Sequence, residues 1–410
     1  MTVDLPTSGL GSRFRVANTA AIPAALFGAF AAVNALILMI RTDFDPSRLV
    51  HAAPPLSDAA NALPSLTVLP LGLGFDGQFY YRLSIAPFSA AAQLGGVSFD
   101  VPSLRGSRIG FGLVGYLLSG GQPALVPAAL MIGNVLLFGA LGLFAGLLVK
   151  SAGKHALWSV LLLVWPGFPY SLALDTAEVL AAVCVVGGLL GLRRERWGWA
   201  AFALVGVAVT RESTVTIVAA LWVTALVQLL AQLRSGRRNP TTVGVFVATS
   251  IAGVAFALVQ LYGYLRFGEI PLLSSGQSNL GIPFEGVLGA LQRSFPPTRG
   301  GHLLDFSGVI LVLVVLICGA VALRRSSAST GEKGAWVITA LMMVSITGPW
   351  ISAASSMRAA VELVIMTMVL VISVPNERLP RRGGLLAVAL QVPVWVLTAG
   401  TMLVKAPNPH

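Results

Sequence analysis

The sequence predicts an all-α polytopic membrane protein, and three observations support this fold class. The 410 residues are 56% apolar and only 10% charged, with a mean hydropathy of +0.83. Soluble domains carry about 25% charged residues. Apolar stretches of about 14–27 residues recur along the chain, and such stretches form helices in lipid because every backbone polar group must be satisfied internally. A soluble enzyme and a disordered chain are both excluded.

The apolar stretches define the expected transmembrane helices, about eleven in number. The first follows two arginines, and its length exceeds the apolar core of about 7–15 residues in a cleaved signal peptide, so we expect an uncleaved span. The two cysteines, Cys184 and Cys318, lie within apolar stretches and offer neither a disulfide framework nor a zinc cluster. The expected spans are residues 18–40, 123–149, 156–174, 177–192, 197–210, 213–233, 242–264, 306–323, 335–353, 358–374 and 384–404.

The formal net charge is +11, and most of the basic residues lie in segments that are expected on the cytoplasmic side. With the N-terminus in the cytoplasm, the cytoplasmic segments hold 16 of the 27 basic residues and only four acidic ones. Every cytoplasmic segment is then basic, as the positive-inside rule expects. We therefore expect a multi-pass protein of the plasma (inner) membrane, and the basic charge does not indicate binding of nucleic acid.

Two extracytoplasmic segments are long, at residues 41–122 and 267–305, within a single transmembrane domain spanning residues 1–410. In the first we expect two short interfacial helices, from Gln78 to Ala92 and from Arg105 to Leu118. Because loops of this length tend to be functional, the working face is expected outside the cytoplasm.

Several spans are too short for the bilayer. The apolar runs 179–192 and 197–210 hold 14 residues each, so each helix covers about 21 Å of a hydrocarbon core of about 30 Å. Arginines fix their cytoplasmic ends, so their outer ends must be recessed. Charges at such depth usually face a cavity. The residues expected in this layer are Asp175, Glu178, Arg211, Glu212, Arg358 and Glu362.

Structural roles for these charges stay open. The Asp175-Thr-Ala-Glu178 stretch fits a capping box, and Asp76 fits an N-cap. Glu212 would favour a helix dipole, and Arg358 and Glu362, one turn apart, would form an ion pair. Three further arginines fit contacts with lipid headgroups: Arg82, Arg105 and Arg108.

Two other positions offer weaker sites. Asp43-Phe-Asp45 has the Asp-x-Asp spacing that suits a divalent metal, but Pro46 follows it directly, which favours a turn. His302, in the second long loop, is a candidate contact for an acceptor, although a lone loop histidine is more often solvated.

The layout suits transfer of a sugar from a polyprenyl phosphate. Arginine binds phosphate through bidentate, charge-assisted hydrogen bonds. One carboxylate suffices as the base of an inverting displacement, and a neighbouring cation stabilises charge in the transition state. No glycine-rich phosphate loop or dinucleotide fingerprint is present in the sequence, so a soluble nucleotide donor is unsupported.

The order of several motifs resembles a known family. A first span leads to Phe75-Asp-Gly-Gln-Phe-Tyr-Tyr81 and then to Arg108-Ile-Gly-Phe-Gly-Leu. Trp165-Pro-Gly-Phe-Pro, Asp175-Thr-Ala-Glu178 and Thr210-Arg211 follow in that order. Over roughly residues 18–235 this arrangement is similar to the GT-C integral-membrane glycosyltransferases, especially mannosyltransferase-like members that use polyprenyl-phosphate sugars.

The resemblance, together with the charge layout and the residue spacings above, gives the following expected roles. Asp76 is the expected catalytic base, and Arg211 and Arg358 the expected ligands of the donor phosphate. A divalent metal is possible, with Asp43, Asp45 or Asp175 as candidate ligands. Relatives often have Trp where Phe75 stands, which leaves the substrate class open. The expected partners are a polyprenyl-phosphate sugar, a lipid or glycan acceptor and membrane lipids. The expected substrate-binding residues are Gln78, Tyr80, Tyr81, Arg82, Arg108, Asp175, Glu178, Glu212 and His302.

Two other functions compete with this one. A transporter or flippase for a lipid-linked or anionic solute would also use intramembrane arginines and acids, although transport folds usually show repeats and a midplane site. A non-enzymatic assembly subunit predicts that the recessed charges all pair with one another and that no cavity exists.

Overall fold

A computed structural model describes residues 8–70, 72, 74–236, 239–274, 279–297 and 300–375. It is 73% helical with almost no sheet, which confirms the all-α class. Five helices are long and apolar enough to cross a membrane, or up to seven if each of two bent helix pairs is one span. This count is lower than the eleven expected spans, because several helices fall short of 18 residues. The expected span 384–404 lies outside the described residues.

The helices nevertheless follow the predicted segments closely. The two bent pairs are α6 (Val160–Leu163, preceded by the 3-10 helix η2, Ala156–Ser159) with α7 (Gly167–Ala173), bent by 63°, and α16 (Ala353–Ala359) with α17 (Val361–Ile372), bent by 48°. The other helices in predicted spans are α1 (Ser8–Arg41), α5 (Val126–Ser151), α8 (Glu178–Arg193), α9 (Trp197–Ala208), α10 (Glu212–Arg234), α11 (Pro240–Phe267), α14 (Gly300–Arg325) and α15 (Thr330–Ser345).

One predicted span is too long at its end. We expected 335–353, but α15 stops at Ser345 and a short 3-10 helix, η4 (Gly348–Ile351), follows. Pro349 lies within that turn and cannot donate a backbone hydrogen bond to a continuing helix.

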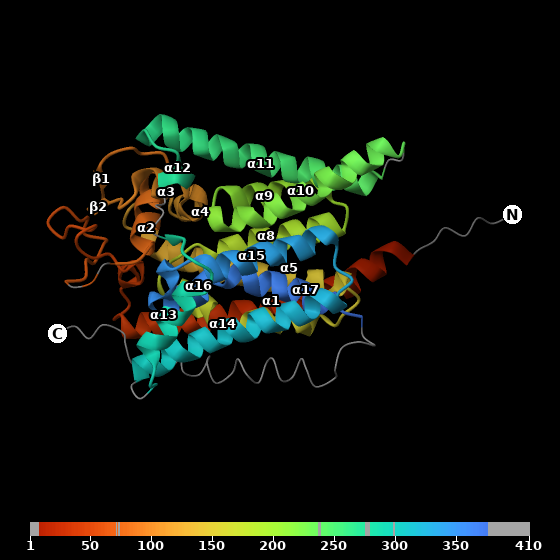
Figure 1. Cartoon of the computed structure of the whole chain (residues 1–410). Helices are drawn as coiled ribbons and strands as arrows, with labels where there is room; N and C mark the ends of the chain where they lie inside the picture. The colour runs from red at the N-terminus through yellow and green to blue at the C-terminus, as the bar shows by residue number, and fades with distance from the viewer. Residues whose placement is uncertain are drawn as a thin grey trace.

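The spanning helices run along a common direction and define two ends (Figure 1). The loop-rich end, at the left of the figure, carries the short elements of both long loops. The basic end, opposite to it, is where α5, α8, α10 and α14 finish with Lys150, Arg193, Arg234, Arg324 and Arg325. The described segments expected in the cytoplasm therefore share one end, as predicted.

The core is densely apolar and the outer helices expose apolar side chains. Helix α8 is buried along nearly its whole length, among residues of α5, α9 and α17. By contrast, Leu36 on α1, Leu265 on α11 and Ile317 on α14 are exposed. Exposed apolar rows on long helices are what a lipid-facing surface requires.

The first long loop contains helices that are more buried than expected. After η1 (Pro46–Val50) come α2 (Gly77–Ile85), the hairpin β1 (Gln93–Leu94) and β2 (Val97–Ser98), α3 (Pro102–Ser107) and α4 (Ile109–Ser119).

The predicted interfacial helix at Gln78–Ala92 is wrong in extent, and its place at the membrane interface stays a prediction. Helix α2 ends at Ile85 and is buried, because Gly112 and Gly115 of α4 let its backbone approach closely. The predicted helix Arg105–Leu118 is broken at Arg108.

The second long loop touches the first. Helix α12 (Pro271–Ser274) lies beside α3, where Ser103 Oγ donates a 2.6 Å hydrogen bond to Ser274 Oγ. Leu272 N donates to Gln260 Oε1 of α11 at 2.8 Å. Helix α13 (Glu285–Ser294) packs on α14 further along the loop. The two long loops are thus joined beside α11.

Candidate functional site

Short helices set the depth of the candidate site. Helix α8 has 16 residues and α9 has 12, so they cover about 24 Å and about 18 Å, against about 30 Å for a hydrocarbon core. Glu178 begins α8, and Arg211 and Glu212 stand at the start of α10, directly after α9. The short lengths of α8 and α9 are what a recessed charge layer requires, and the depth of these charges in a bilayer stays a prediction.

Asp76 lies at the meeting point of three arginines. Its Oδ1 is 3.0 Å from Arg105 Nη1, and its Oδ2 is 3.7 Å from Arg108 Nη1 and 3.8 Å from Arg358 Nη2. The arginines come from α3, the α3–α4 junction and α16, and the Asp76 side chain is 29% exposed. The carboxylate is thus surrounded by cations and still accessible.

Glu178 pairs with Arg358 and with a fourth arginine, Arg211. Its Oε1 is 2.9 Å from Arg358 Nη2 and 2.9 Å from Arg211 Nη1, while its Oε2 accepts hydrogen bonds from Ser171 (2.8 Å) and Thr176. The side chain is only 3% exposed. Both oxygens are therefore fully occupied by protein groups.

Further ion pairs extend this arrangement. Arg108 Nε donates to Glu212 Oε2 at 2.8 Å, Arg105 pairs with Asp100 at 2.8 Å, and Arg211 Nε is 3.8 Å from Glu362 Oε1. We call the whole set the arginine–carboxylate cluster. Its four arginines and five carboxylates give a formal charge of −1; they are Arg105, Arg108, Arg211, Arg358, Asp76, Asp100, Glu178, Glu212 and Glu362.

Close backbone approaches hold the segments that carry the cluster. A Cβ on Gly77 would lie 2.5 Å from the carbonyl oxygen of Leu174, so α2 starts directly against the turn before α8. Trp165 Nε1 donates to the carbonyl of Met357 at 2.8 Å, which fixes the segment that carries Arg358. The Trp-Pro-Gly-Phe-Pro turn therefore supports an arginine nearly 200 residues later in the chain.

The arginines control the ionisation of Asp76. Burial raises the pKa of the Asp76 carboxyl, but Arg105, Arg358 and Arg108 together lower it more, so the pKa lies below its ordinary value. Burial also lowers the pKa values of Arg105 and Arg108, and their carboxylate partners more than reverse this effect. All three groups are therefore charged at neutral pH.

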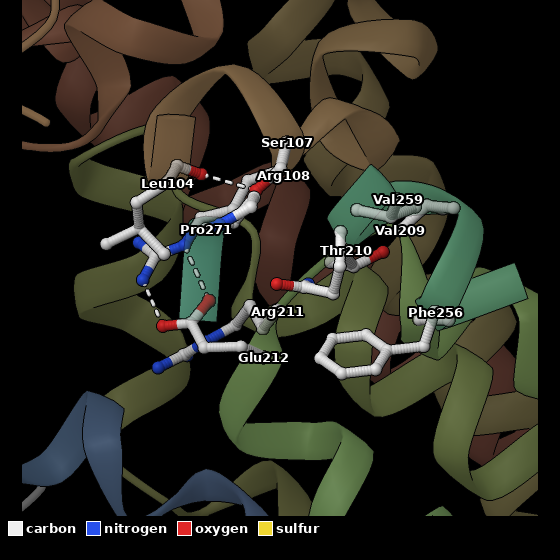
Figure 2. A pocket seen from close by; sticks show the side chains of 12 residues that line it. Leu104, Ser107, Arg108, Val209, Thr210, Arg211, Glu212, Phe256, Val259 and Pro271 are labelled. Atoms are coloured by element: carbon white, nitrogen blue, oxygen red, sulfur yellow. Dashed lines mark hydrogen bonds and ion pairs between the residues drawn. The ribbon is translucent and has the colours of Figure 1, made fainter. Parts of the chain in front are cut away.

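A small pocket adjoins the cluster between α3, α11 and α12 (Figure 2). Arg108 and Glu212 point toward each other at its polar side, and Phe256, Val259 and Pro271 form its apolar side. Its free volume of about 10 Å³ is space for one water molecule. The pocket joins a phosphate-binding type of side chain to an apolar wall, but its free space is small.

The two capping predictions fail at this site. Asp76 occupies the N-cap position of α2 but makes no capping hydrogen bond. The capping box expected from Asp175 to Glu178 is wrong, because α8 begins after Ala177 and Asp175 turns to Asn134 of α5. Asp175 is therefore the one member of the expected charge layer that no described ion pair joins to the cluster.

Arg358 and Glu362 also differ from expectation. We predicted that they begin one helix, with an ion pair as the structural alternative, but the helix breaks at Ala360. Arg358 pairs with Asp76 and Glu178, and Glu362 accepts hydrogen bonds from Ser213 (3.0 Å) and Thr214 (2.9 Å). The break lets the two side chains reach different partners.

Three predicted substrate-binding residues hold the first loop together. Gln78 Oε1 accepts from Ser57 Oγ at 2.8 Å, and the Tyr81 hydroxyl lies 3.0 Å from Ser65 Oγ. Arg82 donates to the carbonyls of loop residues 91, 92 and 97 and is buried. None of the three pairs with an acid of the cluster in the described structure, and their contact with substrate stays a prediction.

The remaining predicted residues divide between the site and the surface. Tyr80 is buried, with its ring 5.3 Å from that of Phe111 and its hydroxyl within the electrostatic influence of Arg108 and Asp76. His302 is exposed in the first turn of α14, and no described contact joins it to the cluster.

Asp43 and Asp45 form a turn, as favoured from the sequence. Asp45 caps η1 by accepting from Ser47 N at 2.9 Å, and it also accepts from Thr67 Oγ1. Asp43 lies 3.7 Å from Arg48. Across the part of the chain that the structure describes, no group of three or more His, Cys, Asp or Glu side chains could hold a metal ion.

Sequence reasoning missed two residues. Arg105 was assigned only to lipid headgroups, although its place three residues before Arg108 would put both on one helical face. Asn134 was not singled out, although it is the one amide side chain in the apolar stretch that forms α5. A lone polar residue inside a span was the available signal.

Comparison of the chain with known protein families finds no matching family, and no curated protein matches it.

Proposed function

We propose that this protein is a GT-C-like glycosyltransferase that moves a sugar from a polyprenyl-phosphate donor to a lipid or glycan acceptor on the extracytoplasmic side of the plasma membrane. One observation carries the proposal: an accessible carboxylate, Asp76, lies within 4 Å of three arginines at the recessed end of short helices. This layout supplies one base and several phosphate ligands at the depth of a lipid headgroup.

The proposed reaction is an inverting displacement. Asp76 accepts the proton of the acceptor hydroxyl while that oxygen bonds to the anomeric carbon. The bond from the anomeric carbon to the phosphate oxygen breaks, and its electron pair leaves with the phosphate. Arg211, Arg358 and Arg108 bind the phosphate and stabilise its added charge. The lowered pKa of Asp76 keeps the base ionised before each turnover.

Donor binding in this scheme requires an exchange of partners. The cluster has a formal charge of −1 and the adjoining pocket is too small for a phosphate, so a phosphate enters by replacing carboxylates at the arginines. Arg108 is the best placed for this, because it faces both Asp76 and the pocket. Glu178, which is buried and fully bonded, keeps its arginine partners in position.

A second candidate is a non-catalytic assembly subunit. The pairing of the cluster members and the small size of the adjoining pocket favour that function, but Asp175, which it predicts to be paired, forms no described ion pair. A transporter or flippase fits less well, because Glu178, Glu212 and Glu362 lie in the first turns of their helices and transport sites usually lie at the midplane.

The first test is a donor screen with the D76N variant. Membranes containing the protein would be assayed for transfer from radiolabelled polyprenyl-phosphate mannose, arabinose, glucose and galactose. We expect transfer from one donor, and a fall of about 10²–10⁴ in kcat for Asp76→Asn with donor binding retained, because general-base catalysis contributes about that factor.

Asp58→Asn provides the matched control, since it is the same change at an exposed position of the same loop and should leave transfer unchanged. Full activity of D76N would disprove the assigned base. An intact protein that transfers from none of the four donors would favour the assembly subunit.

A further inference from the structure

Outside the arginine–carboxylate cluster, one buried pair of polar side chains lacks partners. Asp175 and Asn134 are both 0% exposed, and Asn134 Nδ2 donates a long 3.4 Å hydrogen bond to Asp175 Oδ1. Asp175 Oδ2 and Asn134 Oδ1 have no hydrogen-bond partner. Among the described residues no arginine, lysine or histidine forms an ion pair with Asp175, whereas Glu178, three residues later, pairs with two arginines.

An unpaired carboxylate and an unpaired amide oxygen are both costly in an apolar interior. One small cation removes both costs. A proton on Asp175 Oδ2 removes the buried charge and turns this oxygen into a donor, while Oδ1 of Asp175 continues to accept from the amide of Asn134. A sodium ion would instead take the two free oxygens as ligands, since hard cations prefer oxygen.

We propose that Asp175 and Asn134 form a binding site for one small monovalent cation, a proton or Na⁺, separate from the arginine–carboxylate cluster.

Among the described residues, no cation of a neighbouring element forms an ion pair with Asp175. Helix α1, which ends with Arg41, and η1 also pack on α5. On η1, Arg48 pairs with Asp43 and Asp45, and burial lowers the pKa of the adjoining His51 to about 4, so His51 is neutral near pH 7. Helix α5 contributes Asn134, and its charged residue, Lys150, lies at the opposite, basic end. On α8, Glu178 is occupied by arginines, and on α2 Asp76 is likewise paired while Tyr80 is buried beside Phe111. Helix α7 contributes Tyr170, which is neutral. The acids near Asp175 therefore already have their counter-ions.

The position of the pair gives the cation a structural effect on the candidate site. Asp175 has a left-handed backbone, with φ of 45°, in the turn between α7 and α8. The preceding residue, Leu174, has the carbonyl that meets Gly77 at the start of α2, and Glu178 begins α8 after the same turn. A bound cation therefore fixes the turn that supports both Asp76 and Glu178. The site does not depend on the proposed reaction.

The test compares the full-length wild type with D175N in detergent. Asparagine keeps the size of the side chain and tolerates the left-handed backbone. Asp43→Asn is the matched control, because Asp43 also has a left-handed backbone, with φ of 54°, but is exposed. Thermal unfolding would be followed from pH 5 to 8, in NaCl and in choline chloride of equal ionic strength.

If the cation is a proton, the folded protein binds one more proton than the unfolded chain above about pH 4. Its stability then decreases as the pH rises. Relative to D175N, the ratio of folded to unfolded wild type should fall by up to about tenfold per pH unit. If the cation is sodium, the unfolding midpoint of the wild type at pH 8 is higher in NaCl than in choline chloride. The unfolding midpoint of D175N is the same in the two salts. Either result supports the site.

Equal pH slopes in the two proteins, without any response to Na⁺, would overturn the proposal. Should D175N fail to fold, the wild type and Asn134→Leu still decide the matter. A carboxylic-acid band in the infrared spectrum of the wild type that disappears on alkalinisation, or a sodium response that Asn134→Leu abolishes, supports the site. The absence of both overturns it.

Discussion

Each end of the molecule contains a largely buried ion pair of arginine with glutamate, but the glutamate caps its own helix at only one of the two ends. At the basic end, Arg193 donates to Glu332 Oε1 at 2.7 Å and to Ser373 Oγ at 2.8 Å. Glu332 also completes a capping box with Ser329 at the start of α15. Glu332 therefore caps its own helix and, through Arg193, links it to the ends of α8 and α17.

At the loop-rich end, the acids leave their own helices uncapped. Glu178, Glu212 and Glu362 lie in the first turns of α8, α10 and α17, and none of these helices has a side-chain cap at its N-cap residue. The carboxylates bond to arginines from other segments instead. Capping of their own helices therefore does not explain why these charges are buried, and a ligand is the role that we propose for them.

The largest effect is expected from Glu178→Ala. The change leaves the buried Arg211 and Arg358 without the carboxylate that they share, and removing one partner of a buried ion pair costs about 3–5 kcal/mol. Chemical unfolding in detergent would measure the loss. Glu269→Ala, at an exposed glutamate, is the control. A loss no larger than that of the control would show that the cluster is not held by Glu178.

A smaller effect is expected from Glu332→Ala at the basic end. The variant loses the capping box and a hydrogen bond to a charged group, and such a hydrogen bond contributes about 1.5–3 kcal/mol. Arg193 retains its hydrogen bond to Ser373 and is partly exposed, so its charge is not left buried without a partner. The free energy of unfolding should fall while donor transfer at saturating substrate is unchanged. A selective loss of transfer would show that the two ends are coupled.

The comparison also shows what the sequence could predict. Lengths of apolar runs and the arginines at their ends predicted α8 and α9 nearly to the residue, because a charge in the first or last turn limits where a helix can lie in lipid. The same lengths predicted that Glu178, Arg211 and Glu212 would share a recessed layer. These properties depend on residues close together in the chain.

The failures depend on contacts distant in the chain. Asp175 matched a local capping motif, but its side chain bonds to Asn134, 41 residues earlier. Helix α2 was expected to reach Ala92, but it ends at Ile85 and packs closely against glycines of α4. A local sequence pattern does not show which distant segments pack closely together. The metal, the substrate and the side of the membrane remain predictions.

The smallest expected effect concerns acid stability and distinguishes the two ends. Burial lowers the pKa of His51, in the first loop, to about 4 from 6.5. Since the folded state binds this proton less readily than the unfolded chain, the stability that neutral His51 provides is complete above about pH 6.5 and decreases as the pH falls toward 4, by at most about 2 kcal/mol at pH 5. The lowered pKa of Asp76 means that its ion pairs persist over this range.

His51 packs edge-on against Phe75, with ring centroids 5.6 Å apart, so acid should loosen the segment beside Asp76 first. Hydrogen exchange, corrected for its intrinsic pH dependence, should become faster at residues 46–51 and 75–78 at pH 5 while residues 326–332 at the basic end stay protected. His51→Asn, which tolerates the left-handed backbone at this position (φ of 51°), should remove the difference. An equal acid response in H51N would assign the acid sensitivity of the loop-rich end to a group other than His51.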